Sequence, residues 1–246
     1  MKNLRRTIAF GIGLIMLSAV TYFIQIRLFH SERDTVFYLI QDLAFVPIQI
    51  LLVTVIVDQV LRLREKMAML NRLNMVIGTF FSEAGAPLLK LFSAFDHHID
   101  RVRPELLVNN SWSDRQFAQV ATDLHAYDYR IDAQKSDLGA LKNFLSGKRD
   151  FLLRLLENQS LMEHETFTEL LWAVFHLTEE LEVRSDLSHL PVADREHLAG
   201  DIKRAYTILI SEWLSYMKHL KKEYPYLFSL AVRTNPFDEN ASASFK

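Results

Sequence analysis

The chain has 246 residues, half of them hydrophobic, a formal net charge of −2 and no cysteine. The near-neutral charge excludes the broad basic surface typical of a nucleic-acid-binding protein, and the lack of cysteine excludes disulfides, thiolate nucleophiles and cysteine-based zinc sites. Only seven glycines and six prolines occur. Because the stretches between them show apolar residues at helical spacing, we predict an all-α fold.

Two apolar segments near the amino end predict a transmembrane hairpin over residues 1–60. The first lacks charge from Thr7 to Ile26, and about 20 residues at 1.5 Å each match the ~30 Å thickness of the hydrocarbon layer. The second segment is apolar but contains Gln41, Asp42, Pro47 and Gln49. We place the two spans at about 7–27 and 36–58 and expect a kink at Pro47.

Positive charges outside both segments predict the orientation of this hairpin. They precede the first segment and follow the second, at Lys2, Arg5, Arg6, Arg62, Arg64, Lys66 and Arg72. We therefore expect a multi-pass protein of a bacterial-type cell inner membrane with both termini in the cytoplasm. If the first segment were instead a cleaved signal peptide, the domain after Leu61 would still face the cytoplasm.

Polar residues inside the predicted spans form a candidate site. An ionisable group such as Asp42 costs several kcal/mol in hydrocarbon unless it is paired. On helical spacing we expect an intramembrane polar cluster of Tyr22 and Gln25 from the first helix and Asp42 and Gln49 from the second. This cluster is predicted to clamp the hairpin. The alternative is an oligomer that gathers several copies of Asp42 and Gln49 around a path for ions or protons.

The helix that leaves the membrane carries a heptad pattern. No glycine or proline occurs between Pro47 and Gly78, so the second span should continue as one helix. Its apolar seam is Leu63, Met67, Leu70, Asn74 and Ile77. A buried asparagine in such a seam often fixes register. The seam either forms a parallel homodimer or packs on the chain's own bundle.

Residues 61–237 read as one cytoplasmic helical bundle, followed by a flexible tail over 238–246. The run Gly85-Ala86-Pro87 should break the long helix. Helices are predicted to begin at capping boxes, to end near glycine or proline, and to follow one another with short connections. The expected starts are Ser113 with Gln116, about Ser136, Thr166 with Glu169, and Pro191, with an interruption near Gly147 and the helix after Thr166 at the centre.

We find no catalytic signature. Phosphate-binding glycine loops and G-x-S-x-G are absent, and His164-Glu165 lacks the second histidine of a zinc-protease helix. Glu169, His176 and Glu180 are weak metal-ligand candidates, because His176 and Glu180 lie four residues apart on one helix face. The simpler interpretation is a solvated acidic face, so no metal or other cofactor is assigned.

These patterns favour a membrane-anchored helical scaffold or signal-transducing module without catalytic activity. One alternative is an oligomeric channel or transport-associated protein with a polar path at Asp42 and Gln49. Another is a metal-binding helical-bundle enzyme. The partners we expect are the lipid bilayer, further copies of this chain as a homo-oligomer, and a protein that the sequence does not identify; we expect no nucleic acid.

Overall fold

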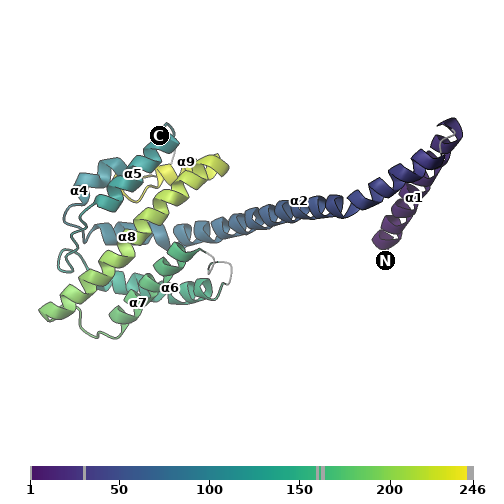
Figure 1. The fold of residues 1–246 in the computed structure, drawn as a ribbon. Helices are drawn as coiled ribbons and strands as arrows, with labels where there is room; N and C mark the ends of the chain where they lie inside the picture. The colour runs from purple at the N-terminus through teal and green to yellow at the C-terminus, as the bar shows by residue number, and fades with distance from the viewer. Residues whose placement is uncertain (1, 30–31, 159–160, 162–163, 243–246) are drawn as a thin grey trace. The chain divides into compact units, whose positions relative to one another are not determined.

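The computed structural model describes residues 2–29, 32–158, 161 and 164–242 (Figure 1). Over these residues the chain consists of helices, turns and one isolated bridge between Asp96 and Ile131, which confirms the all-α prediction. The chain divides into two compact units, residues 1–66 and 67–246. The predicted boundary followed residue 60, so the observed one lies slightly further along the chain.

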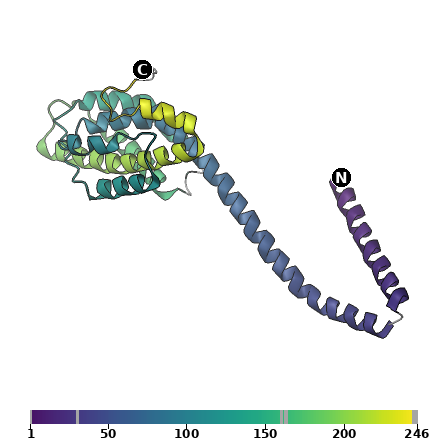
Figure 2. The same cartoon turned by 90° about the horizontal axis from the view of Figure 1, so that it is seen from above.

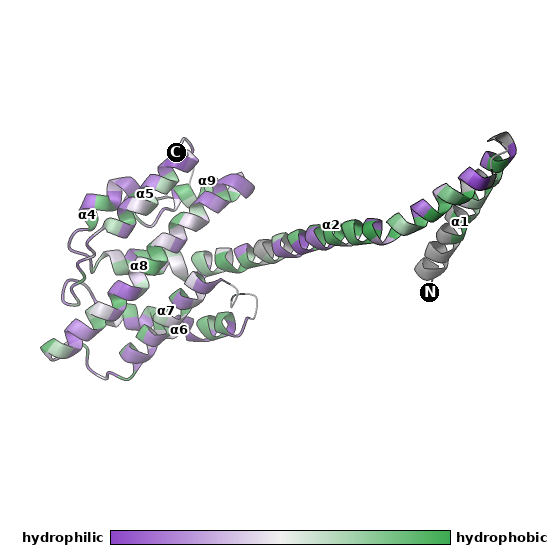
Figure 3. Cartoon of the chain, viewed as in Figure 1, coloured by the Kyte–Doolittle hydropathy of each residue, from purple (hydrophilic) through white to green (hydrophobic). Residues whose placement is uncertain are grey.

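The first unit contains α1 (Lys2–Phe29) and the start of α2 (Glu32–Phe80), a continuous helix with Pro47 inside it. Val36–Met67 is long and apolar enough to cross a membrane and is not buried at all. Figure 3 shows hydrophobic turns along α2 with hydrophilic turns between them. A second such segment, Leu73–Ser93, is 44% buried and contributes to the core of the bundle. Among the residues of α1 whose side chains the structure describes, the apolar segment is Ile15–Arg27.

A widened turn joins α2 to the rest of the bundle. Where the sequence predicted a break, the π-helical turn η1 (Phe81–Gly85) leads directly into α3 (Ala86–Ser93). A Cβ atom on Gly85 would lie 2.6 Å from Phe81 Cδ1 and 2.8 Å from Phe80 Cε1. The glycine is therefore needed because two phenylalanine rings cover its Cα, rather than to end the helix.

The middle of the second unit begins with two short helices, α4 (Ile99–Val102) and η2 (Arg103–Leu106), and continues into α5 (Asp114–Ala126). Ser113 caps α5 as predicted. The Gln116 backbone N–H donates to Ser113 Oγ at 3.3 Å, and the Ser113 N–H donates to Gln116 Oε1 at 2.7 Å.

The next two helices are α6 (Leu138–Leu156), which continues through Gly147, and α7 (Glu165–Glu182). The predicted Thr166 cap of α7 is wrong. The cap is His164, whose Nδ1 accepts the Phe167 N–H at 3.2 Å, because an imidazole nitrogen can replace the usual hydroxyl oxygen. Thr166 lies inside the first turn and donates to Glu212 at 2.5 Å.

The centre of the bundle is α8 (Val192–Glu223), which packs against α7, η1, α3, α5 and the following α9 (Pro225–Arg233). Figures 1 and 2 show α8 crossing the bundle. The prediction that α7 is central is wrong, since α7 packs mainly on α6 and α8 and Trp172 is 58% exposed. The predicted first residue of α8, Pro191, is its N-cap instead.

The end of the chain is attached to the bundle. Asn235 Nδ2 donates to the Leu106 carbonyl at 2.8 Å, and the buried Phe237 ring lies 5.1 Å from the Trp213 ring. Within the tail predicted to be flexible, the Ser242 N–H donates to the Arg233 carbonyl at 2.9 Å. Residues 238–242 thus make defined contacts, and 243–246 lie outside the described residues.

Candidate functional sites

The polar cluster of the first unit brings three of its four predicted members together. The Tyr22 hydroxyl on α1 donates to Asp42 Oδ2 on α2 at 3.1 Å. Both side chains, with Gln25, line a cleft of about 470 Å³ whose walls also include Ser18, Thr21 and Tyr38. Gln49 is exposed and does not line this cleft, because it lies nearly two turns beyond Asp42.

The predicted seam of α2 divides into two parts. Ile77 is buried in the bundle, and Asn74 Nδ2 lies 3.4 Å from Nδ1 of His219 on α8. Burial lowers the pKa of His219, which favours the neutral ring that can accept this hydrogen bond. Leu63 and Met67 are 64% and 59% exposed, whereas the Leu70 side chain lies outside the described residues.

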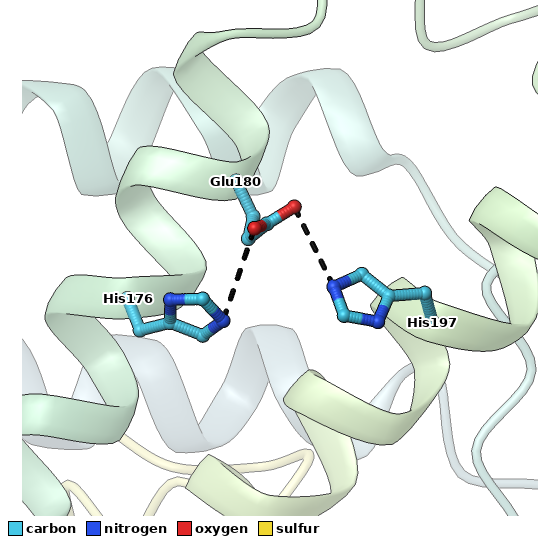
Figure 4. A group of neighbouring side chains, drawn as sticks. All are labelled: His176, Glu180 and His197. Carbon is cyan, nitrogen blue, oxygen red and sulfur yellow. Dashed lines mark ion pairs between the residues drawn. The ribbon is translucent and has the colours of Figure 1, made fainter.

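A second polar cluster, which we call the α7–α8 cluster, consists of His176, Glu180, His197 and Asp201. Each helix supplies one histidine and one carboxylate four residues apart, so both side chains of a pair lie on one face. A short connection folds α8 back along α7, and Figure 4 shows His176, Glu180 and His197 pointing toward one another.

The donor atoms of this cluster surround a small common space. His197 Nε2 lies 3.3 Å from Asp201 Oδ2 and 3.6 Å from Glu180 Oε2. His176 Nε2 lies 3.6 Å from Asp201 Oδ2 and 3.9 Å from Glu180 Oε1. One ligand atom each from His176, Glu180 and His197 fall within 4.8 Å of one another. Two imidazole nitrogens and two carboxylate groups form a donor set that can hold a transition-metal ion.

The cluster is buried on its carboxylate side and open on its histidine side. The Asp201 side chain is 4% exposed, while those of His176 and His197 are 45% and 52% exposed. Among the described residues, Asp201 Oδ2 has no hydrogen-bond partner. Arg204 Nη1 lies 3.5 Å from the other oxygen, Oδ1.

Glu180 is held by an arginine. Arg184 Nη1 donates to Glu180 Oε2 at 2.5 Å, and Nη2 lies 3.5 Å from Asp194. This hydrogen bond, more than any neighbouring charge, lowers the pKa of Glu180. The carboxylate is therefore ionised at neutral pH, as a metal ligand must be.

Two of the three weak metal candidates, His176 and Glu180, belong to the cluster, and Glu169 does not. Sequence reasoning missed His197 and Asp201. The available signal was the repeated spacing of a histidine followed four residues later by a carboxylate, once in each of two successive helices.

A third polar cluster surrounds Asp96, which is fully buried. Its carboxylate accepts the Tyr127 hydroxyl at 2.8 Å and the His98 N–H at 2.9 Å. Among the described residues, the buried hydroxyls of Tyr129 and Tyr206 have no hydrogen-bond partner. Burial raises the pKa of both tyrosines. The cluster faces the core and stabilises the junction between residues 96–98 and 127–132.

Comparison with known proteins places the chain in a family. It is 45% identical over 241 residues to "Uncharacterized protein MJ1433" of Methanocaldococcus jannaschii, covering 98% of this chain and 97% of that one. A model described as "Uncharacterized protein MJ1433, C-terminal helical domain" matches residues 69–233, and one described as "MJ1433, N-terminal helical domain" matches residues 2–61. The chain belongs to the MJ1433 family. No solved structure matches it.

The two family models describe helical domains and name no activity. The N-terminal domain match contains Tyr22, Gln25 and Asp42, and the C-terminal match contains the whole α7–α8 cluster. Function must therefore be argued from the sites themselves.

Proposed function

We propose that this MJ1433-family chain is a multi-pass protein of the cell inner membrane, in which a helical hairpin anchors a cytoplasmic bundle that acts as a scaffold or signal transducer. The main support for a membrane anchor is the apolar part of α2. Val36–Met67 has a mean hydropathy of 2.1 and none of it is buried. An apolar surface of this extent is unfavourable in water and favourable in lipid.

The contact between α1 and α2 supports a hairpin in lipid. A carboxylic acid in hydrocarbon needs a partner, and Asp42 accepts a hydrogen bond from Tyr22 at 3.1 Å. Interhelical hydrogen bonds of this kind contribute about 0.6–1.7 kcal/mol in membrane proteins. The positive residues that flank both segments favour a cytoplasmic location of both termini.

The course of α2 supports a role in transmission. The same helix that carries the apolar segment ends with Leu73, Ile77 and Phe80 buried in the core of the second unit. A shift or rotation of α2 would therefore require these buried side chains to repack. Because close-packed cores respond in discrete steps rather than by continuous deformation, such a helix can pass a change at the membrane to the bundle.

Topology can be tested with single cysteines, since the chain has none of its own. We would express Arg33→Cys and Ala241→Cys variants and treat intact cells with a membrane-impermeant maleimide. We expect the chain to stay in the membrane fraction after alkaline carbonate washing, Arg33→Cys to react from outside, and Ala241→Cys to react only after permeabilisation. Reaction of Ala241→Cys in intact cells, or release of the chain by carbonate, would refute the proposal.

A second candidate function is an oligomeric channel, because hydroxyl and amide groups of Ser18, Thr21 and Gln25 line the cleft beside Asp42. In this case several hairpins assemble around a polar path. Proton and cation flux would be measured in liposomes containing the wild type or Asp42→Asn. Flux that the substitution changes would support conduction, and no flux from either protein would remove this candidate.

A further inference from the structure

We propose that His176, Glu180, His197 and Asp201 bind one divalent transition-metal ion between α7 and α8. This site does not depend on the membrane proposal. It joins residues that the sequence separates into two helices, and it requires only the local geometry of the second unit.

The spacing of the donor atoms fits a metal ion. Nitrogen and oxygen ligands lie about 2.0–2.1 Å from Zn²⁺, which makes the edge of the coordination tetrahedron about 3.3 Å long. The four histidine–carboxylate separations in the α7–α8 cluster are 3.3, 3.6, 3.6 and 3.9 Å. His176, Glu180 and His197 already have ligand atoms within 4.8 Å of one another, and Asp201 Oδ2 lies beside both imidazoles. A shift of the Asp201 and Glu180 carboxylates toward a common ion would complete the set.

Other histidine–carboxylate pairs of the same chain behave differently. His97 Nε2 lies 3.0 Å from Asp132, and His189 Nδ1 lies 3.1 Å from Asp186. These are ordinary hydrogen-bond distances. In the α7–α8 cluster none of the four pairs closes to such a distance, although each imidazole has two carboxylates beside it. The imidazole nitrogens and carboxylate oxygens of this cluster therefore lie around a common space without forming hydrogen bonds to one another.

The buried carboxylate gives an independent indication. Asp201 is 4% exposed, and its Oδ2 is the atom that both imidazole nitrogens approach, yet it has no hydrogen-bond partner among the described residues. A buried carboxylate oxygen is costly without a partner or a metal. A bound cation in the gap would satisfy this oxygen directly.

The donor set indicates the class of ion and its role. Two imidazoles favour Zn²⁺, Fe²⁺, Co²⁺ or Ni²⁺ over Mg²⁺ or Ca²⁺, which prefer all-oxygen sites. Four protein ligands fill a tetrahedral shell, as in structural sites, whereas catalytic zinc keeps one position open. The ion would thus fasten α7 to α8. Arg184 would retain Asp194 as a partner if Glu180 turned to the metal.

The test uses the full chain without a polyhistidine tag, purified in detergent and stripped with EDTA. Zn²⁺ would be titrated in, and bound metal would be measured by mass spectrometry after gel filtration. We expect one Zn²⁺ per chain, and a loss of more than about tenfold in affinity for His197→Asn and for Asp201→Asn, since even outer-shell partners are worth that much. The matched control is His189→Asn, whose histidine also has a carboxylate neighbour and should leave binding unchanged.

Two further measurements distinguish this site from adventitious binding. Co²⁺ should give the intense visible absorption of a tetrahedral ion in the wild type and in His189→Asn, and lose it in His197→Asn. Zn²⁺ should raise the melting temperature of the wild type but not of Asp201→Asn, because only an ion bound to the folded state stabilises it. Absence of bound zinc, or equal affinity in the wild type, His197→Asn and Asp201→Asn, would overturn the proposal.

Discussion

The Tyr127 hydroxyl donates a 2.8 Å hydrogen bond to the carboxylate of Asp96, which has no exposed surface. Tyr206 lies in the same cluster, with its ring 5.5 Å from that of Tyr129, but its hydroxyl has no hydrogen-bond partner among the described residues. The two hydroxyls therefore differ in what they contribute to the folded state.

Removing the hydroxyls of Tyr127 and Tyr206 should have unequal effects on the free energy of unfolding. Tyr127→Phe withdraws a donor from a buried carboxylate and should cost about 1–3 kcal/mol, which corresponds to several degrees in melting temperature for a domain of this size. Tyr206→Phe removes an unpaired polar atom and should be neutral or slightly stabilising. Circular dichroism melts of the detergent-purified variants provide the comparison. Equal destabilisation by both would show that Tyr206 has a partner after all.

Alkaline pH should weaken the bundle. Burial raises the pKa of Tyr206 well above its ordinary value and also that of Tyr129, whereas in the unfolded chain a tyrosine loses its proton at about pH 10. Keeping these tyrosines protonated therefore costs the folded state nothing below about pH 10. As pH rises further, the unfolded chain loses the tyrosine protons first, and the free energy of unfolding falls. Melting temperatures from pH 8 to 11 should fall less for Tyr206→Phe than for the wild type. Tyr226 is exposed, so Tyr226→Phe should follow the wild-type curve and serves as the control.

The two glycines Gly85 and Gly147 should respond oppositely to alanine. A Cβ at Gly85 would lie 2.6 Å from a carbon of Phe81, whereas a Cβ at Gly147 would have no neighbour within 4 Å. We expect Gly85→Ala to cost about 1–3 kcal/mol through overpacking and Gly147→Ala to stabilise α6 by up to about 1 kcal/mol. Thermal melts of both variants measure this. A Gly85→Ala protein as stable as the wild type would mean that the phenylalanine rings move aside easily.

The exposed part of the α2 seam, Leu63 and Met67, allows the predicted homo-oligomer to be tested. Asn74 and Ile77 are engaged within the bundle, so a parallel homodimer would have to use Leu63 and Met67. Oxidation of membranes that contain Leu63→Cys should give a disulfide-linked dimer, and Glu65→Cys, on the opposite side of the helix, should give little. If Leu63→Cys stays monomeric under conditions that oxidise free thiols, the homodimer through this seam is ruled out.

Local signals in the sequence predicted local structure well. The serine and glutamine that cap α5 lie three residues apart, and no distant residue is needed for them to act. The same reasoning was wrong at α7, because His164 used a ring nitrogen that resembles no standard cap. Capping preferences rest on the side-chain oxygens of serine, threonine, aspartate and asparagine, so they do not predict a cap by an imidazole nitrogen.

Contacts between helices were harder to predict. His176 and Glu180 share a helix face, which spacing alone reveals, but their meeting with His197 and Asp201 depends on how α8 returns along α7. Glu169, the third metal-ligand candidate, lies about two turns before His176 on α7 and is not part of the cluster. Likewise, Tyr22 was correctly placed beside Asp42 because a short connection fixes the register of two adjacent helices, while Gln49 had no such constraint.

The burial of residues 228–237 has a consequence for biosynthesis. Phe228, Asn235 and Phe237 are buried parts of the second unit, and Asn235 bonds to Leu106, which is made much earlier. Because the ribosome adds residues in order, the core around Leu106 cannot close until residues 228–237 have been made. Until then the apolar side chains that they cover are exposed, and a growing chain would need protection from aggregation during that interval.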